Sequence, residues 1–158
     1  MKLVIASDHA GFALKNKLIL LIGQYDPSIE VEDLGPEAYN EGDDYPDYVG
    51  KVGRYISQNP NAKELRGVVI GGSGQGENIC VNRYVYVRSV LIYGHDMVLN
   101  TKIAKLSREH NDANVISFGA RFIEEDHVFE ILKIWLLEPF SGDERHVRRL
   151  AKLESTQQ

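Results

Sequence analysis

The apolar positions of the chain follow two alternating patterns, short aliphatic runs and longer segments of helical spacing. Lys2 to Ser7 is an aliphatic run, and apolar residues then recur at helical spacing from Phe12 to Ile22. The same alternation predicts further strands at 29–34, 68–70, 87–93 and 115–118, and helices that begin at Pro46 and cover 77–82, 97–106, 124–137 and 143–154. Strands that alternate with helices favour right-handed crossovers and a mostly parallel sheet.

We therefore predict an α/β fold, a three-layer sandwich around a five-stranded, mostly parallel sheet with the strand order 2-1-3-4-5. The length of 158 residues suits one domain over 1–158. Ligands of such sheets bind beyond the carboxyl ends of the strands, near the point where the strand order reverses. Asp8-His9, the loop 71–76 and Arg121 each follow a predicted strand. We expect one rim of the sheet to collect them.

Composition narrows the classes of function. The net charge of −5 argues against general nucleic-acid binding, which neutralises many phosphates with Lys and Arg. No apolar run approaches the roughly 20 residues that span a bilayer, so we expect a cytoplasmic protein without membrane contact. The single cysteine, Cys80, excludes an intrachain disulfide and, without clustered His or Cys, a zinc site.

The glycine-rich stretch 71–76 follows a predicted strand and precedes a predicted helix, an arrangement that presents backbone N–H groups to an anion. Glu77 stands where a dinucleotide fingerprint needs its third glycine, and Glu77-Asn78 where a P-loop needs Lys followed by Ser or Thr. A carboxylate beside a backbone cradle instead suits proton abstraction next to a carbonyl. The alternative is an acidic residue favoured in the first turn of a helix.

Other polar residues allow a binding role and a structural one. Asp8 and His9 form a conceivable acid–base pair for ring opening, whereas Asp8 alone is typical of a helix N-cap. His110 and Asn111 end a helix with groups that bind sugar hydroxyls, although a histidine there is more often structural.

A basic cluster occupies one short segment near the carboxyl terminus. In an acidic chain such a cluster favours a small anionic ligand, and a solvated helix face is the alternative. Arg145 and Arg149 are four residues apart and share a helix face, where two guanidinium groups suit one phosphate, whereas Arg148 points elsewhere.

Taken together, these motifs resemble the family of type B ribose-5-phosphate isomerases and the related galactose-6-phosphate isomerase subunits. The resemblance covers nearly the whole chain, with the motifs in the order and spacing of the family. It rests on Ser7 to Gly11, Asp44 to Pro46, Gly71 to Glu77, Ser107 to Asn111, Phe118 to Arg121, and Arg145-His146 followed by Arg149.

The resemblance implies a Rossmann-like fold, no cofactor or metal, and a homodimer or a tetramer with active sites between subunits. It implies that Glu77 is the base and that His110 is the acid that assists ring opening. Residues 141–158 are expected to form a helix and tail that carry phosphate-binding arginines. The implied substrate-binding residues are Asp8 and His9 at the sugar, Gly72, Ser73, Gly74, Gln75 and Gly76 at the enediolate oxygen, Asn111 at a hydroxyl, and Arg121, Arg145 and Arg149 at the phosphate.

The family has two branches that differ in the base. One uses a Cys directly after the third strand and the other a Glu after the glycine loop; this chain has Gly71 at the first position and Glu77 at the second. Cys80 is therefore not the base, and we expect it to be a small buried residue. Tyr86 stands where the family usually has a glycine, which leaves the oligomer size and the preferred sugar length open.

The resemblance thus predicts an aldose–ketose isomerase that interconverts ribose 5-phosphate and ribulose 5-phosphate through an enediolate. Isomerisation of a hexose 6-phosphate, such as allose or galactose 6-phosphate, is an alternative, because the same groups serve either length. A non-catalytic phosphosugar-binding module is a second alternative, which the presence of Glu77 and His110 disfavours. A flavodoxin-like cofactor carrier is disfavoured by Glu77 at the end of the glycine loop and by the lack of flanking aromatic residues there.

Overall fold

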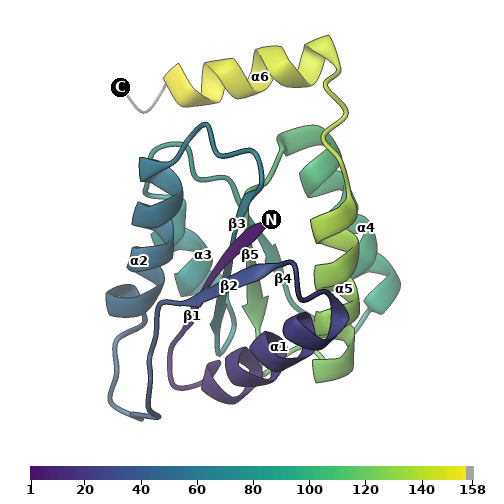
Figure 1. Cartoon of the computed structure of the whole chain (residues 1–158). Helices are drawn as coiled ribbons and strands as arrows, with labels where there is room; N and C mark the ends of the chain where they lie inside the picture. The colour runs from purple at the N-terminus through teal and green to yellow at the C-terminus, as the bar shows by residue number, and fades with distance from the viewer. Residues whose placement is uncertain (156–158) are drawn as a thin grey trace.

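The structure, a computed structural model, describes residues 1–155 as a five-stranded parallel sheet with helices around it (Figure 1). The predicted tail at 156–158 lies outside the described residues. The strands are β1 (Lys2–Ser7), β2 (Glu30–Asp33), β3 (Leu65–Gly71), β4 (Ser89–Ile92) and β5 (Val115–Gly119). The helices are α1 (Phe12–Tyr25), α2 (Tyr45–Gln58), α3 (Gln75–Val81), α4 (Met97–Asn111), α5 (Glu125–Leu137) and α6 (Glu144–Ser155).

The strand order is β2-β1-β3-β5-β4, so the α/β sandwich is confirmed, but the predicted order 2-1-3-4-5 was wrong at its end. β5 pairs with β3, with Gly67 opposite Val115, and β4 occupies the edge beside β5. All five residues of β5 are buried, whereas three of the four residues of β4 are only half-buried. A central strand of a parallel sheet has both faces covered, and this agrees with the complete burial of β5 at the inner position.

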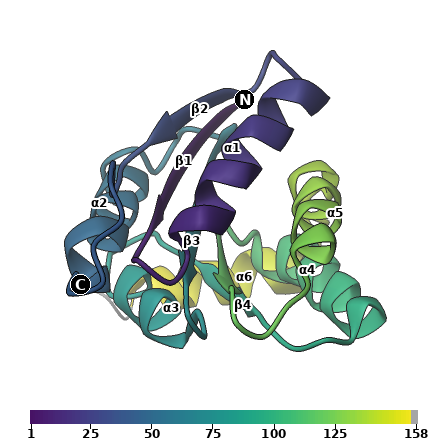
Figure 2. The same cartoon turned by 90° about the horizontal axis from the view of Figure 1, so that it is seen from below.

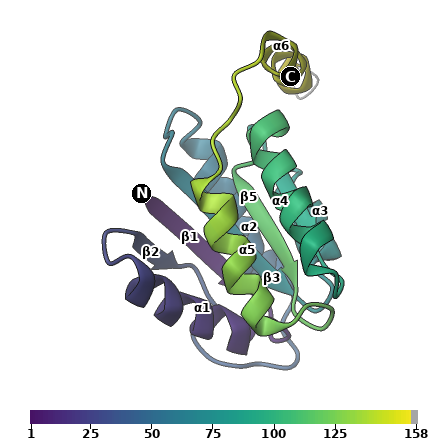
Figure 3. The ribbon, with the colours of Figure 1, turned by 90° about the vertical axis from the view of Figure 1, so that its right-hand side faces the viewer.

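The sheet divides two hydrophobic layers. Alternate residues of β1 point to opposite faces, as the period of a strand requires: Leu3 and Ile5 join one cluster, Val4 and Ala6 the other. The first cluster is covered by α1, α4 and α5, and the second by α2 and α3, as Figures 2 and 3 show from two directions. The three layers predicted from the sequence are therefore present.

Helix α6 stands apart from these layers, beyond the amino ends of the strands (Figures 1 and 3). It packs near the end of α4: the Ser141 backbone N–H donates to the Glu109 carbonyl over 3.1 Å, and the side chain of His146 is buried. Val147 and Leu153 on α6 are half-exposed. The helix therefore holds part of its apolar surface away from the body of its own chain.

Candidate active site

The loops that follow β1, β3 and β5 meet at the carboxyl ends of the strands, which Figure 2 shows from below. The Asp8 backbone N–H donates to the Ile70 carbonyl over 3.2 Å, and the Arg121 N–H donates to the Gly72 carbonyl over 3.0 Å. Residues from these loops therefore lie together at one rim of the sheet, as the strand pattern predicted, and we call them the carboxyl-end cluster. Its members are Asp8, His9, Gly72, Ser73, Gly74, Gln75, Gly76, Glu77 and Arg121.

Glu77 lies in the first turn of α3 with its side chain buried, and the residue as a whole is 4% exposed. Its carboxylate lies against Gly71, where an added Cβ would stand 1.9 Å from Glu77 Oε1. Any side chain at position 71 would collide with Glu77 as it is placed here. A cysteine at the first base position and this placement of Glu77 therefore exclude each other.

The surroundings of Glu77 favour its uncharged form. Burial raises the pKa of Glu77 above its ordinary value, and the nearby Asp8 carboxylate raises it further, while a backbone hydrogen bond opposes both effects. A carboxylate is a better base when its pKa lies closer to the working pH. Burial in the first helical turn thus makes the Glu77 carboxylate more basic than an exposed one.

Gly74 of the glycine loop approaches the Phe118 backbone too closely for a larger side chain. Gly74 is the N-cap of α3 in a left-handed conformation with φ of 72°, and its carbonyl accepts a 2.7 Å hydrogen bond from the Ser117 hydroxyl. The Arg121 guanidinium lies beside Gly72, where an added Cβ would be 3.4 Å from it. The loop therefore places backbone amides, the Ser73 hydroxyl and one cation around the same rim as Glu77.

Asp8 and His9 have separate local partners. Asp8 is 8% exposed, and its Oδ1 accepts a 3.0 Å hydrogen bond from the Gly11 N–H in the turn before α1. This is close to the structural role that the sequence allowed for Asp8, although the capping residue of α1 itself is Gly11. Its negative charge nevertheless reaches Glu77, so Asp8 belongs to the electrostatics of the cluster.

Asp43 is a site residue that sequence reasoning missed. Its Oδ1 accepts from the His9 backbone N–H over 3.1 Å and lies 2.7 Å from His9 Nδ1, and its side chain is 1% exposed. Because Oδ1 accepts, Nδ1 carries the proton and Nε2 is the ring nitrogen available to a ligand. The only signal in the sequence was an acidic pair, Asp43-Asp44, directly before the expected helix at Pro46.

The remaining predicted residues lie at the other end of the sheet. His110 and Asn111 form the last turn of α4, and Arg145 and Arg149 lie on α6. Because helices of a parallel α/β sheet run opposite to the strands, the end of α4 lies at the amino ends of the strands. These four residues make an amino-end cluster, which the single chain does not bring to Glu77.

The amino-end cluster is more exposed than the carboxyl-end cluster. The side chains of His110 and Arg145 are 37% and 60% exposed. The His110 ring lies 4.4 Å from the ring of His146, measured between centroids, and His146 Nδ1 lies 2.9 Å from the Ser141 hydroxyl. Burial lowers the pKa of His146, and the positive charges of Arg145 and His110 lower it further.

Within residues 1–155, no three or more His, Cys, Asp and Glu side chains are grouped so that they could hold a metal ion. Across the same residues, no helix combines the length and the apolar character that crossing a membrane demands. Cys80 is half-buried against the second hydrophobic cluster, rather than buried as expected, and burial raises the pKa of its thiol.

Comparison with known proteins places the chain in a family. The family model described as Ribose/Galactose Isomerase matches residues 3–153. A putative sugar phosphate isomerase of Bacillus subtilis is 37% identical, over 97% of this chain and 95% of that protein. Ribose-5-phosphate isomerase B of Mycolicibacterium paratuberculosis is 33% identical, over 100% of this chain and 94% of that protein.

A solved structure gives the same result. Ribose-5-phosphate isomerase B from Mycoplasma genitalium, crystallised with bound ribulose-5-phosphate, superimposes with a TM-score of 0.87 at 30% identity, covering 98% of this chain and 95% of the other. The matches in sequence and structure extend over nearly the full length of both chains. The chain therefore belongs to the ribose/galactose isomerase family and is a sugar-phosphate isomerase of that family.

Proposed function

We propose that this protein interconverts ribose 5-phosphate and ribulose 5-phosphate by moving a proton between adjacent carbons, with Glu77 as the base. The observation that carries the proposal is the buried Glu77 carboxylate beside the glycine loop, with its pKa raised by burial. The relative from Mycoplasma genitalium was crystallised with ribulose-5-phosphate, which supports the choice of a five-carbon substrate.

The chemistry needs a base and a stabilised oxyanion. Glu77 takes the proton from the carbon beside the carbonyl and returns it to the neighbouring carbon, so that an enediolate forms between the two transfers. The Ser73 hydroxyl and the amides of the glycine loop bind the oxygen that becomes negative, and each such donor contributes about 3 kcal/mol to the transition state. Arg121 holds the phosphate end of the same sugar in this proposal, which the position of its guanidinium beside Gly72 supports.

We further propose that a second copy of the chain completes each site. His110 as ring-opening acid, Asn111 at a sugar hydroxyl, and Arg145 and Arg149 at the phosphate would come from the amino-end cluster of the partner. The separation of the two clusters along the sheet supports this arrangement, as do the exposed side chains of the amino-end cluster. A twofold dimer would form two such sites, because it joins the same pair of surfaces twice.

The first experiment measures conversion of ribose 5-phosphate to ribulose 5-phosphate by the purified protein and by Glu77→Gln. We expect the variant to lose about 10² to 10⁴ in kcat while it still binds the substrate. Loss of binding with turnover preserved would contradict the role of base. The same assay with allose 6-phosphate and galactose 6-phosphate tests the six-carbon alternative, since the matching family model includes galactose in its description.

A hybrid dimer tests whether Glu77 and His110 of one site belong to different copies. Glu77→Gln and His110→Asn are each expected to be inactive or nearly so, and the two are co-expressed in equal amounts. About half of the dimers are then hybrids, in which one site carries both changes and the other carries neither, so about a quarter of the wild-type activity returns. If both residues served one site from the same chain, no activity would return.

A further inference from the structure

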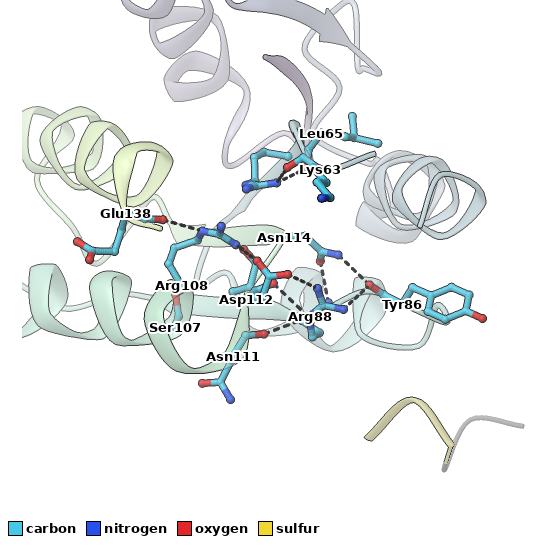
Figure 4. A network of polar contacts seen from close by, with 12 residues as sticks. Lys63, Leu65, Tyr86, Arg88, Ser107, Arg108, Asn111, Asp112, Asn114 and Glu138 are labelled. Carbon is cyan, nitrogen blue, oxygen red and sulfur yellow. Dashed lines mark hydrogen bonds and ion pairs between the residues drawn. The ribbon is translucent and has the colours of Figure 1, made fainter. Parts of the chain in front are cut away.

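A cavity lies at the amino ends of the strands, at the opposite end of the sheet from the carboxyl-end cluster. It has a volume of about 320 Å³ and is lined by three arginines that come from separate elements of the fold. Arg66 lies on β3, Arg88 directly precedes β4, and Arg108 lies on α4. Figure 4 shows the polar network around Arg88 and Arg108. A cavity of this size accommodates a small ligand.

The lining of this arginine cavity carries an excess of positive charge. Lys63 joins the three arginines, and Asp112 is the carboxylate that faces them within the cavity. Asp112 pairs with Arg88 over 3.1 Å and with Arg108 over 2.7 Å, so one carboxylate is shared by two guanidinium groups. Glu154 of α6 also pairs with Arg88, over 3.2 Å, which leaves Arg66 without an acidic partner among the described residues.

One buried N–H group among these arginines has no acceptor in the described chain. Arg66 donates from Nη1 to the carbonyls of Lys63 and Leu65, but its buried Nε meets no hydrogen-bond partner. Arg108, by contrast, donates from Nη1 to Asp112 and to the Ala113 carbonyl, and from Nε to the Glu138 carbonyl. A buried donor such as Arg66 Nε is costly unless an acceptor completes it.

The side chains of Arg88 and Arg108 are largely buried rather than exposed at the surface. The side chain of Arg108 is 4% exposed, and that of Arg88 is 15% exposed. Burial lowers the pKa of Arg66 to about 10, and the positive charges of Arg108 and Arg88 contribute to this shift. An anion among the three groups would reverse that unfavourable electrostatics, since opposite charges within a few ångströms stabilise the charged form.

We propose that the arginine cavity is a binding site for a phosphate group, held by Arg66 and Arg108 together with Lys63. Guanidinium groups match the oxygens of a phosphate through paired N–H donors, which favours phosphate over a monatomic anion. The site uses none of the residues assigned above to the substrate. Its ligand is either inorganic phosphate or the phosphate of a small metabolite, and the volume leaves room for the latter.

The test is calorimetric titration of the purified protein with inorganic phosphate, at an ionic strength held constant with KCl. Arg66→Gln is expected to weaken phosphate binding at one site by about tenfold or more, because a hydrogen bond to a charged group is lost. Arg54→Gln removes the same charge from an exposed position on α2 and should leave binding unchanged. Arg149→Ala, which alters the proposed substrate site, should retain the phosphate site that Arg66→Gln weakens.

Two further arms make the result decisive. Lys63→Glu reverses a charge at the cavity and is expected to weaken phosphate binding at the same site. It replaces Arg66→Gln as the test if that variant does not fold. Repeating the titration with glycerol 3-phosphate separates the sources: tighter binding of the ester identifies a metabolite, and equal or weaker binding identifies inorganic phosphate. The proposal is overturned if folded Arg66→Gln or Lys63→Glu binds phosphate as tightly as Arg54→Gln, or if Arg149→Ala abolishes all phosphate binding.

Discussion

The carboxyl-end and amino-end clusters differ in how firmly their own chain holds them. Glu77 is buried against Gly71. It lies beside the glycine loop, in which the Gly74 carbonyl accepts a hydrogen bond from the Ser117 hydroxyl. Arg145 on α6 is largely exposed, and α6 touches the body mainly near the end of α4. The first cluster is preorganised by one chain, which suits the proton transfer proposed for it. The amino-end cluster has the exposure expected of residues that contact a second copy of the chain.

The largest effect expected on the carboxyl-end cluster, beyond loss of Glu77 itself, comes from Gly71→Ala. The new Cβ would stand 1.9 Å from Oε1 of Glu77 and push the carboxylate from its place. A displacement of about 1 Å costs about 10² in rate, so we expect kcat to fall by that factor while the fold persists. Steady-state kinetics and a melting curve measure the two quantities.

Gly23→Ala is the matched control for this change. Gly23 lies in α1, and within the described chain no heavy atom comes within 4 Å of the position of its missing Cβ. Alanine should stabilise the helix by about 0.5–1 kcal/mol without an effect on kcat. Equal kinetics for the two variants would show that Glu77 does not need the space at Gly71.

For the amino-end cluster we expect a change in binding rather than in chemistry. The phosphate does not react, so Arg149→Ala should raise KM for ribose 5-phosphate about tenfold and leave the weak turnover of free ribose unchanged. Arg148→Ala, the neighbour predicted to point elsewhere, is the control on the same helix. Equal effects of Arg149→Ala on both sugars would refute the phosphate role.

An effect of similar size is expected at Asp43, which contacts His9. Asp43→Asn removes the charge that holds His9 Nδ1 and should lower kcat/KM about tenfold. If Asp43 acts through His9, the double variant Asp43→Asn/His9→Asn will be no slower than His9→Asn alone. Additive losses would mean that Asp43 has a role of its own, and a double-variant cycle in kcat/KM measures this directly.

The sequence predicted the carboxyl-end cluster well, for a physical reason. Asp8, the glycine loop and Arg121 each follow a buried strand, and parallel strands end on one side of a sheet. The exchange of β4 and β5 was not predictable in the same way, because both segments are short and apolar, and only the burial of each within the sheet distinguishes them.

Contacts between distant loops were the other limit. Asp43 meets His9 across 34 positions of the chain, and no pattern of spacing encodes that pairing. His110 and Asn111 end α4, as the sequence predicted, and the direction of this helix puts them at the amino end of the sheet. The division of the predicted site between two ends of the sheet follows from helix direction, which the spacing of the motifs does not encode.

The smallest expected effect concerns stability, and it tests the burial of Glu77 without an assay of activity. The ordinary pKa of this carboxyl is 4.5, and burial raises the pKa in the native state. Between the two values the native state binds more protons than the unfolded chain, so stability falls as the pH rises through this window. Above both values the ionised Glu77 destabilises the fold, a penalty that glutamine does not carry.

Glu77→Gln is therefore expected to raise Tm by a few degrees at about pH 8. At about pH 4 we expect little or no change, because the carboxyl of Glu77 is then largely protonated in both the native and the unfolded state. Glu41→Gln, an exposed carboxylate in the loop before α2, should show no such pH-dependent gain. A lower Tm for Glu77→Gln at about pH 8 would mean that the charged carboxylate is stabilised where it lies. In that case the contrast between the two clusters would rest on exposure alone, because the buried cluster would hold no base made reactive by its surroundings.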